Sequence, residues 1–192
     1  EEKIARPESF QIVTMADGRS SFHRKNVLGA VEIFQAAFAD IDTVRLVVKS
    51  RNLALFPAYH DALQKKLSGD PRITIIDANM TETEIQSLLA NSDVLLSPQQ
   101  AEGFGIPLAE AMMKGSVVDA TGWSGNIDFM TPQNSVCLHF TLEPVKDPSG
   151  VYQAQESTWA NVDIEASAKA LRALHADRDR LKKLAQNAGK DM

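Results

Sequence analysis

The fold is decided by residues 10–48, which read FQIVTMADGRSSFHRKNVLGAVEIFQAAFADIDTVRLVV. The opening run, residues 10–15, is apolar and strand-like, and the turn-forming pair Asp17-Gly18 follows it directly. From Val27 onward the apolar residues recur at the spacing of three and four that is typical of a helix. Residues 44–48 are apolar-rich again. The stretch therefore predicts a strand, a loop, a helix and a second strand.

The same alternation continues along the chain. Thr81 followed by Glu84 is a capping-box signature, so a helix is expected from there to about Ala90. The other expected strands are residues 72–76, 93–97, 117–118 and 136–140, and the other expected helices are residues 58–67, 107–114, 164–175 and 178–188. Nearly continuous apolar strands that alternate with helices indicate a mostly parallel sheet covered on both faces. The predicted class is a doubly wound α/β fold with about six strands.

The segment 141–158 breaks this pattern. It contains Pro144, Pro148 and Gly150 and shows little periodicity, so it is expected to be an irregular surface excursion. It would separate a core at about 10–140 from two closing helices at about 160–190. With 192 residues, of which 44% are hydrophobic, the chain is expected to form a single domain.

Bulk properties limit the possible partners. The net charge of -5, from 20 basic and 25 acidic side chains, gives no sequence-wide reason to expect nucleic acid or an anionic membrane. Cys137 is the only cysteine, which fits a reducing compartment, and the cytoplasm is expected. His60, His139 and His175 have no suitably spaced carboxylate or cysteine partners, so no metal site is predicted.

No apolar run is long enough to cross a bilayer, and residues 1–10 lack the apolar segment of a secretion signal. The chain also reaches its first strand abruptly, at Phe10. We therefore expect it to be an excised or processed part of a longer protein.

In open α/β sheets, ligands bind beyond the carboxyl ends of the strands, so the strand-to-helix loops are the candidate sites. The loop after the fourth strand leads into Glu102-Gly103-Phe104-Gly105-Ile106-Pro107-Leu108-Ala109-Glu110. Pro107 suits a first helical turn, and the two glycines let the backbone approach a ligand closely. Because carboxylates repel phosphate, Glu102 and Glu110 are better suited to accept hydrogen bonds from sugar and ribose hydroxyls.

A simpler interpretation of the two glutamates is a solvated loop residue and a favourable charge near a helix start. Phe104, held between Gly103 and Gly105, argues for a ligand site instead, since an ordinary helix cap does not need that arrangement.

The loop after the first strand is basic. Arg19, His23, Arg24 and Lys25 come immediately before a helix, where their cations are placed to hold a diphosphate and to stabilise its charge as it leaves. The alternative is a solvated basic loop without a ligand.

Together these residues resemble the retaining glycosyltransferases with two Rossmann-like domains, the GT-B fold, and specifically family 4, also called group 1. Glu102 and Glu110 match the E-x7-E motif of that family in its EGFG-x-P-x-x-EAM context, and Arg19 and Lys25 stand six apart as its phosphate-contacting Arg and Lys do. The segment 121–130 resembles a bacterial surface-polysaccharide subgroup. The resemblance runs from about 10 to 173.

The resemblance implies transfer of a hexose from a nucleoside diphosphate sugar, GDP-mannose by the subgroup likeness, to a saccharide or lipid-linked acceptor, with retention and without a metal or other cofactor. Arg19, Lys25 and Glu102 would be the catalytic residues. The donor-binding residues would be Gly103, Phe104, Gly105, Ile106, Leu108, Ala109 and Glu110, with Asp77 from the segment 76–80 that supports the base.

The sequence departs from the family pattern at several places. Asp77-Ala78-Asn79 stands where the family has a glycine after the third strand, Ser116 replaces a usual proline, and Gln99 or Gln100 stands in place of a histidine. These departures affect the preference for the base and the contacts with the sugar.

The chain is long enough for only one half of a GT-B enzyme. The amino-terminal, acceptor-binding domain would be absent, and a peripheral location at the inner face of the membrane would come through that missing domain. The function expected is therefore donor binding within an incomplete glycosyltransferase. The alternative is a non-catalytic module that binds sugar nucleotides for regulation.

Overall fold

The structure of the protein is a computed structural model, which describes residues 9–154 and 156–192. Its centre is a sheet of six strands in the order β3-β2-β1-β4-β5-β6, in which every neighbouring pair is parallel. The strands are β1 (Phe10–Asp17), β2 (Val44–Arg51), β3 (Ile73–Asp77), β4 (Val94–Ser97), β5 (Val117–Thr121) and β6 (Val136–Leu138). This order is that of a doubly wound sheet. The predicted fold class is confirmed.

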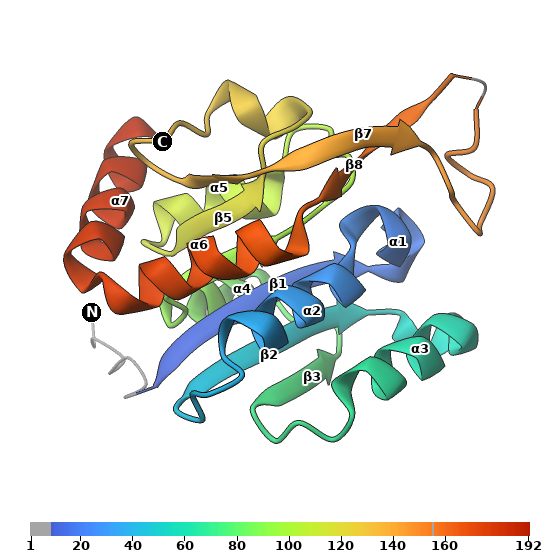
Figure 1. Cartoon of the computed structure of the whole chain (residues 1–192), viewed down its shortest axis with the longest axis horizontal. Coiled ribbons are helices and arrows are strands. Elements are labelled where there is room, and N and C mark those ends of the chain that lie inside the picture. Colours follow the sequence, from blue (N-terminus) through green and yellow to red (C-terminus); the bar gives the residue numbers. More distant parts are fainter. Residues whose placement is uncertain (1–8, 155) are drawn as a thin grey trace.

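Helices cover both faces of the sheet (Figure 1). The helices are α1 (Phe22–Lys25), α2 (Val27–Ala37), α3 (Pro57–Leu67), α4 (Glu82–Ala90), α5 (Ile106–Met113), α6 (Ile164–Ala176) and α7 (Arg178–Asp191), with short 3-10 turns η1 (Gly18–Ser20), η2 (Leu53–Leu55) and η3 (Gly125–Asp128). One layer contains α2, α3 and α6, and the other contains α4 and α5.

The core consists of two apolar clusters, one on each side of the sheet. Alternate residues of a strand point to opposite faces, which divides β5 between them: Val117 faces the cluster under α2 and α6, and Val118 faces the cluster under α5. Because both faces are buried, every residue of β4 and β5 is buried. This is why β4 begins with the apolar run of residues 94–96 and β5 with Val117-Val118, although β5 also buries Asp119 and Thr121.

Local signals place the helix ends where the sequence predicts them. At the start of α4 the Thr81 hydroxyl accepts a hydrogen bond from the amide of Glu84, and the Glu84 carboxylate accepts one from the amide of Thr81. The loop predicted after β1 contains one helical turn, α1, which Ser21 caps at its start and Asn26, in the left-handed conformation, ends. His175 packs edge-on against Phe10, with 5.0 Å between ring centroids.

The expectation of an irregular excursion over 141–158 is wrong at its two ends. Strands β7 (Phe140–Pro144) and β8 (Thr158–Val162) pair antiparallel as a separate two-stranded sheet, and the sixth strand predicted over 136–140 ends at Leu138. The hairpin extends past the carboxyl ends of the parallel strands, on the side of α1 (Figure 1). The sequence does not predict the hairpin because β7 is mostly exposed, and because prolines stand at the end of β7 and in the turn of the hairpin.

No helix among residues 9–154 and 156–192 has the length and apolarity to cross a membrane. The interpretation of residues 1–10 as lacking a secretion signal lies, except for its last residues, outside the described part of the chain.

Candidate functional site

The site is built where the loops after β1 and β4 meet. These strands are neighbours in the sheet, and the helices that follow them, α2 and α5, cover opposite faces, so their loops diverge at this point. Such a switch point is the usual position for a ligand in an open α/β sheet. Hydrogen bonds to the backbone join the loops: the amide of Gln100 donates to the carbonyl of Arg24 at 2.7 Å, and the side chain of Asn26 donates to the carbonyl of Pro98 at 3.0 Å.

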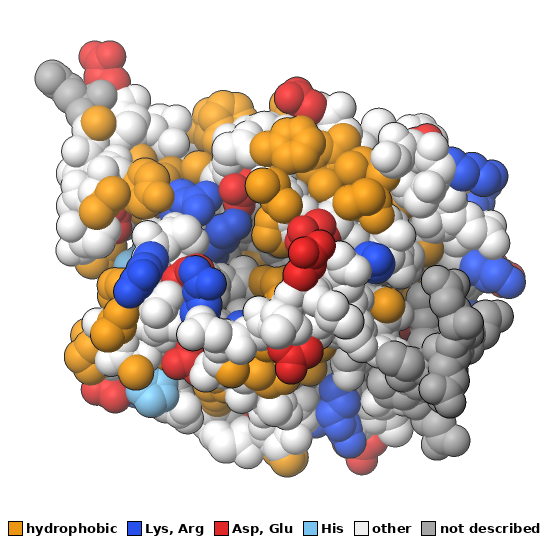
Figure 2. Space-filling view, turned by 180° about the vertical axis from the view of Figure 1, so that it is seen from behind, with side chains coloured by type: hydrophobic (Ala, Val, Ile, Leu, Met, Phe, Trp, Pro, Cys, Tyr) orange, Lys and Arg blue, Asp and Glu red, His pale blue; other side chains and the backbone are white. Residues whose placement is uncertain are grey.

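The two loops bring opposite charges together. The Lys25 ammonium pairs with the Glu102 carboxylate, and the Arg24 guanidinium lies 3.5 Å from the same carboxylate oxygen. Arg24 also donates to the carbonyl of Ala101 at 2.7 Å. The side chains of all three paired residues are only 11–12% exposed, so bulk water screens their charges weakly. In Figure 2, Lys and Arg side chains gather with acidic ones around a hollow at the end of the molecule where the parallel strands finish.

Arg19 is also at this end of the molecule but does not join the Lys25–Glu102 pair. It lies in η1 and is exposed, and its amide donates to the Asp17 carboxylate at 3.0 Å. Burial raises the pKa of Asp17, but hydrogen bonds from Arg19, Asn52 and Arg51 outweigh that effect and leave the pKa below its usual value. Asp17 thus orders the turn that carries Arg19, and the Arg19 side chain remains available to a ligand.

The start of α5 presents backbone amides. Gly105 is the N-cap residue, with φ of 91°, a conformation that favours glycine. The amides of Leu108 and Ala109 donate to the Gly105 carbonyl at 2.8 and 3.1 Å, so these two predicted contacts are already used inside the protein. Within the described residues, no hydrogen bond uses the amides of Phe104, Gly105 and Ile106, which is the arrangement that binds anions at a helix start.

A second turn holds the Glu102 loop from the other side. The Ser124 hydroxyl and the Gly125 amide donate to the Glu102 carbonyl at 2.6 and 3.1 Å. A Cβ atom on Gly125 would overlap the Gly103 carbonyl oxygen, so only glycine fits there. The fully buried Asn126 accepts a hydrogen bond from Gln99 at 3.1 Å. In the sequence Ser124, Gly125 and Asn126 lie within the segment 121–130, and only the family resemblance marks them, because turn-forming Ser, Gly and Asn are common without any ligand.

The remaining predicted residues are more scattered. Phe104 and Ile106 are 53% and 63% exposed, and the Phe104 ring packs against Phe129 with 5.2 Å between ring centroids. Glu110 is partly buried on α5, and it forms no ion pair with any described residue. Asp77 accepts hydrogen bonds from the Ser50 hydroxyl and from the Leu53 amide, at 3.1 and 3.2 Å. Its carboxylate therefore fixes η2, and its contact with a ligand stays a prediction.

The β7–β8 hairpin contributes contacts to the site that the sequence does not predict. The Arg24 guanidinium lies over the ring of Tyr152, 5.7 Å from its centroid, and the amide of Ala160 donates to the carbonyl of Gln100 at 2.8 Å. Both contacts join residues far apart in the sequence, so no local signal could have found them. Among residues 9–154 and 156–192, no group of three or more His, Cys, Asp or Glu side chains is placed to hold a metal ion.

These features define one Rossmann-like domain of a GT-B protein. Comparison with known proteins agrees: the family model described as glycosyl transferases group 1 matches residues 12–177. The chain belongs to this family. No curated protein matches it closely in sequence.

Solved structures share the fold. The C-terminal domain of a group 1 glycosyltransferase, LpcC from Francisella tularensis, is 20% identical with a TM-score of 0.72, and the match covers 97% of this chain and 85% of that one. HepE from Anabaena is 16% identical with a TM-score of 0.70, covering 95% and 43%. WaaG is 20% identical with a TM-score of 0.69, covering 96% and 43%. The chain thus spans less than half the length of HepE and of WaaG.

Proposed function

We propose that this chain is the donor-binding domain of a retaining glycosyltransferase that moves a hexose from a nucleoside diphosphate sugar to a saccharide or lipid-linked acceptor. One observation carries the proposal: Lys25 and Glu102, from loops far apart in the sequence, meet beside the α5 amides at the switch point of the sheet. Cations and amides suit a diphosphate, and a carboxylate between them suits the hydroxyls of a sugar.

In this proposal the protein acts mainly by electrostatics. When the bond between the sugar and the diphosphate breaks, negative charge grows on the leaving diphosphate. Lys25, Arg19 and the α5 amides would stabilise that charge, without a bound metal or other cofactor. Glu102 is already paired with Lys25, so a bound diphosphate would compete for Lys25 and release the Glu102 carboxylate to the hydroxyls of the sugar.

The rest of the donor follows from the same placement. Glu110 would accept hydrogen bonds from the ribose, and the backbone near Asp77 would support the base. The structure of HepE contains UDP and glucose, and WaaG is described as a glycosyltransferase involved in lipopolysaccharide biosynthesis. These relatives support a nucleotide sugar as donor and a role in cell-surface polysaccharide synthesis. GDP-mannose remains our proposal for the donor, and the inner face of the membrane, through an amino-terminal domain, for the location.

A second candidate is a non-catalytic module that binds sugar nucleotides. The observation that favours it is that the Lys25–Glu102 pair and the unused amides of Phe104, Gly105 and Ile106 suit the binding of a donor whether or not transfer follows. A parent gene that also encodes an acceptor-binding domain would decide for the transferase.

The test is a comparison of ligands with Glu102→Ala. This change removes the acceptor for sugar hydroxyls but leaves Lys25, so it should weaken binding of the sugar nucleotide about 10- to 100-fold, as the loss of hydrogen bonds to a charged group would. Binding of the matching nucleoside diphosphate should stay equal or tighten, because Lys25 loses its competitor. Isothermal calorimetry measures both affinities, with Glu165→Ala, an exposed glutamate of α6, as the control. Equal losses for the two ligands would contradict the role of Glu102.

A further inference from the structure

Lys49 is a buried cation near the carboxyl end of β2. Only 5% of the residue is exposed, and its ammonium donates hydrogen bonds to the carbonyls of Ser50 and Ala78, at 2.6 and 2.7 Å. Lys49 forms no ion pair with a described residue, whereas Arg24 and Lys25, which are also largely buried, share a carboxylate. A buried ammonium without a paired carboxylate lowers stability, so its presence indicates a function beyond the fold.

The Asp77 carboxylate does not neutralise Lys49 directly. Adjacent residues of a strand point to opposite faces of the sheet, so Lys49 and Ser50 lie on different faces. Asp77 pairs with Ser50 in register, and its carboxylate accepts hydrogen bonds from the Ser50 hydroxyl and the Leu53 amide. Burial lowers the pKa of Lys49, and the charge of Asp77 only partly opposes this effect. The ammonium therefore has no direct counter-charge among the described residues.

Lys49 lies on the face of the sheet that α4 and α5 cover. Val47, two residues earlier in β2, packs against the apolar cluster under α5, and Lys49 points to the same side. Only β1 separates β2 from β4 (Figure 1), so the ends of β2 and β4 are two strand spacings apart, about 10 Å. A nucleotide whose diphosphate lies at the α5 amides can therefore place its base over the end of β2.

The loop that follows β3 is open to solvent beside Lys49. Asp77, Ala78 and Asn79 are exposed, and the Ala78 amide donates to the Ser50 carbonyl at 3.3 Å. The Lys49 ammonium bonds to the same Ser50 carbonyl and to the Ala78 carbonyl, so it fastens the loop to the end of β2. An ammonium has three N–H groups, and these contacts use two of them. Among the described residues the third has no partner.

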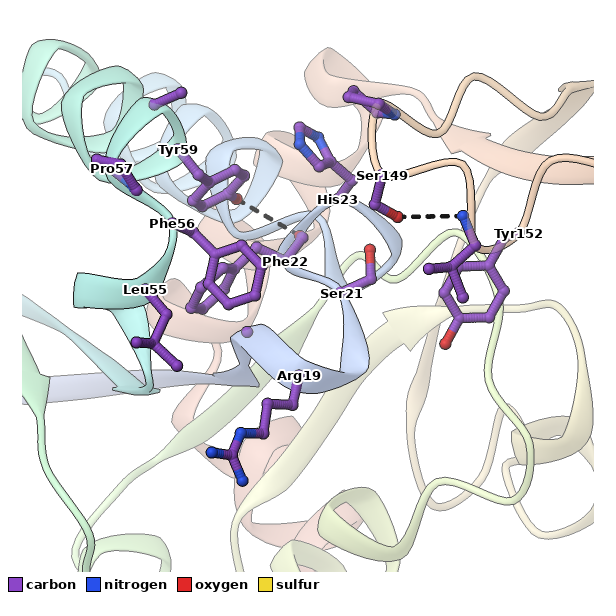
Figure 3. A pocket seen from close by; sticks show the side chains of 14 residues that line it. Arg19, Ser21, Phe22, His23, Leu55, Phe56, Pro57, Tyr59, Ser149 and Tyr152 are labelled. Atoms are coloured by element: carbon purple, nitrogen blue, oxygen red, sulfur yellow. Dashed lines mark hydrogen bonds between the residues drawn. The ribbon is translucent and has the colours of Figure 1, made fainter.

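Arg19 differs from Lys49 in how firmly it is held. Arg19 is exposed, and Figure 3 shows its side chain extending away from the rings of Phe22 and Tyr59. A long exposed cation suits a phosphate group, which it can meet in several orientations. Lys49 is instead held by two carbonyls and presents its third N–H at a fixed place, as the recognition of a single ligand atom requires.

The bases of nucleotides differ in the group that they would present to such a donor. Guanine and uracil carry a carbonyl oxygen, an acceptor, where adenine and cytosine carry an amino group, a donor. We propose that Lys49 selects the base of the sugar nucleotide by donating its third N–H to the carbonyl oxygen of guanine or uracil. Adenine or cytosine would leave that buried donor without an acceptor. This inference rests on the proposed function, and it names the class of base and the residue that recognises it.

Two matched pairs of ligands test the proposal. IDP and ADP share a purine and differ chiefly in an oxygen or an amino group on the six-membered ring, and UDP and CDP differ in the same way. Isothermal calorimetry should show tighter binding of IDP than of ADP, or of UDP than of CDP, by about 10- to 150-fold, the value of a hydrogen bond to a charged group. The pair that shows the difference identifies a purine or a pyrimidine site. Equal affinities within both pairs would overturn the proposal.

Lys49→Met removes the charge and keeps an unbranched side chain. The domain should remain folded, because the Ser50 carbonyl keeps the Ala78 amide and the exposed Ala78 can bond to water. The preference for the oxygen-bearing base should fall below about threefold, through weaker binding of the preferred ligand. Lys183→Met, at an exposed position of α7, is the control and should keep the preference. A preference that survives in Lys49→Met, or an equal loss of affinity for both members of the pair, would overturn the proposal.

The same titrations separate this inference from the proposed function. If the nucleoside diphosphates bind without a preference within either pair, the role of Lys49 fails and the donor site stands. If a folded sample binds none of them, the role of Lys49 fails together with the proposed function.

Discussion

Lys25 and Glu102 are 77 residues apart in the sequence, yet their side chains form a partly buried ion pair. Each charge lowers the cost of burying the other, and Arg24 gives Glu102 a second positive neighbour. The pair therefore does not depend on a ligand, but a diphosphate is a stronger partner for Lys25 than a single carboxylate. At the scale of residues, the site is a set of charged side chains that are largely shielded from water. In the proposed function Lys25 exchanges Glu102 for the diphosphate of the donor.

Lys25→Met should lower the affinity for a nucleoside diphosphate by about 1.5–3 kcal/mol, the usual contribution of a hydrogen bond to a charged group, or about 10- to 150-fold. The fold should survive, because Arg24 still neutralises Glu102. Calorimetric titration gives the affinity and thermal unfolding checks the fold. Lys65→Met, at an exposed position of α3, is the matched control, and a loss no larger than that of the control would contradict the role of Lys25.

Gly125→Ala should destabilise the donor loop. Its Cβ would overlap the Gly103 carbonyl oxygen, which is backbone and cannot turn away. Overpacking of this kind costs about 1–3 kcal/mol, which for a domain of this size lowers Tm by about 2–12 °C. Differential scanning calorimetry measures the shift, and binding of the nucleotide sugar should fall with it.

Gly189→Ala is the control for that change. Gly189 lies in α7, and an added Cβ would meet no atom within 4 Å, so alanine there should be neutral or raise the stability by up to about 1 kcal/mol. A Gly125→Ala protein as stable as Gly189→Ala would show that the 124–126 turn does not clamp the Glu102 loop.

Residues of the site differ in how far the sequence could predict them. Glu102 and Lys25 are expected to share one cleft, because their loops follow strands whose carboxyl ends lie on one edge of a parallel sheet, and the structure brings them together. Gly125 lies in the segment 121–130 that carries part of the family resemblance, but its close approach to Gly103, like the contact of Tyr152 with Arg24, joins distant segments and has no local signal. Residues that the strand order brings to one edge of the sheet can be predicted from the sequence. Contacts that depend on packing between distant loops cannot.

At the scale of elements, β5 contains an unusual buried carboxyl group. Asp119 is fully buried in the middle of the strand, and neither of its carboxylate oxygens has a hydrogen-bond partner among the described residues. Burial raises its pKa to about 8, with Arg180 opposing the effect. In the folded protein this carboxyl group is therefore protonated at neutral pH.

The raised pKa makes the stability depend on pH. Between about pH 4, where an unfolded Asp ionises, and about pH 8, unfolding releases a proton from Asp119, so its contribution to stability falls as the pH rises, by roughly 1 kcal/mol per unit. Asp119→Asn should remove this slope, so its stability relative to the unaltered protein should be greater at pH 8 than at pH 5. Urea unfolding across this range measures the effect, and parallel curves for the two proteins would contradict it.

Elements are predicted well where they are buried and poorly where they are exposed. Residues 94–96 of β4 and 117–118 of β5 appear as apolar runs because both faces of the sheet are covered, and the Thr81 capping box marks the start of α4. The β7–β8 hairpin lies outside the main sheet, so half of its side chains face solvent and the apolar pattern is weak. Its turn then contains Pro148 and Gly150, which are typical of loops.

At the scale of the whole molecule, the parallel sheet gathers every candidate ligand contact at one end. The carboxyl ends of the strands, the start of α5, the basic loop and the hairpin tip all lie there, and the helices and core behind them hold these parts in place. The chain covers 43% of HepE and of WaaG. In the proposed function this domain supplies the donor site, and transfer would need an acceptor-binding part.

The central claim, that this chain binds a nucleoside diphosphate sugar, is tested most directly by calorimetric titration of the chain with UDP-, GDP- and ADP-sugars. We predict saturable binding of at least one of them, with GDP-mannose as the proposed donor, and a heat signal that Lys25→Met strongly reduces. A folded sample that binds none of these sugar nucleotides would contradict the claim.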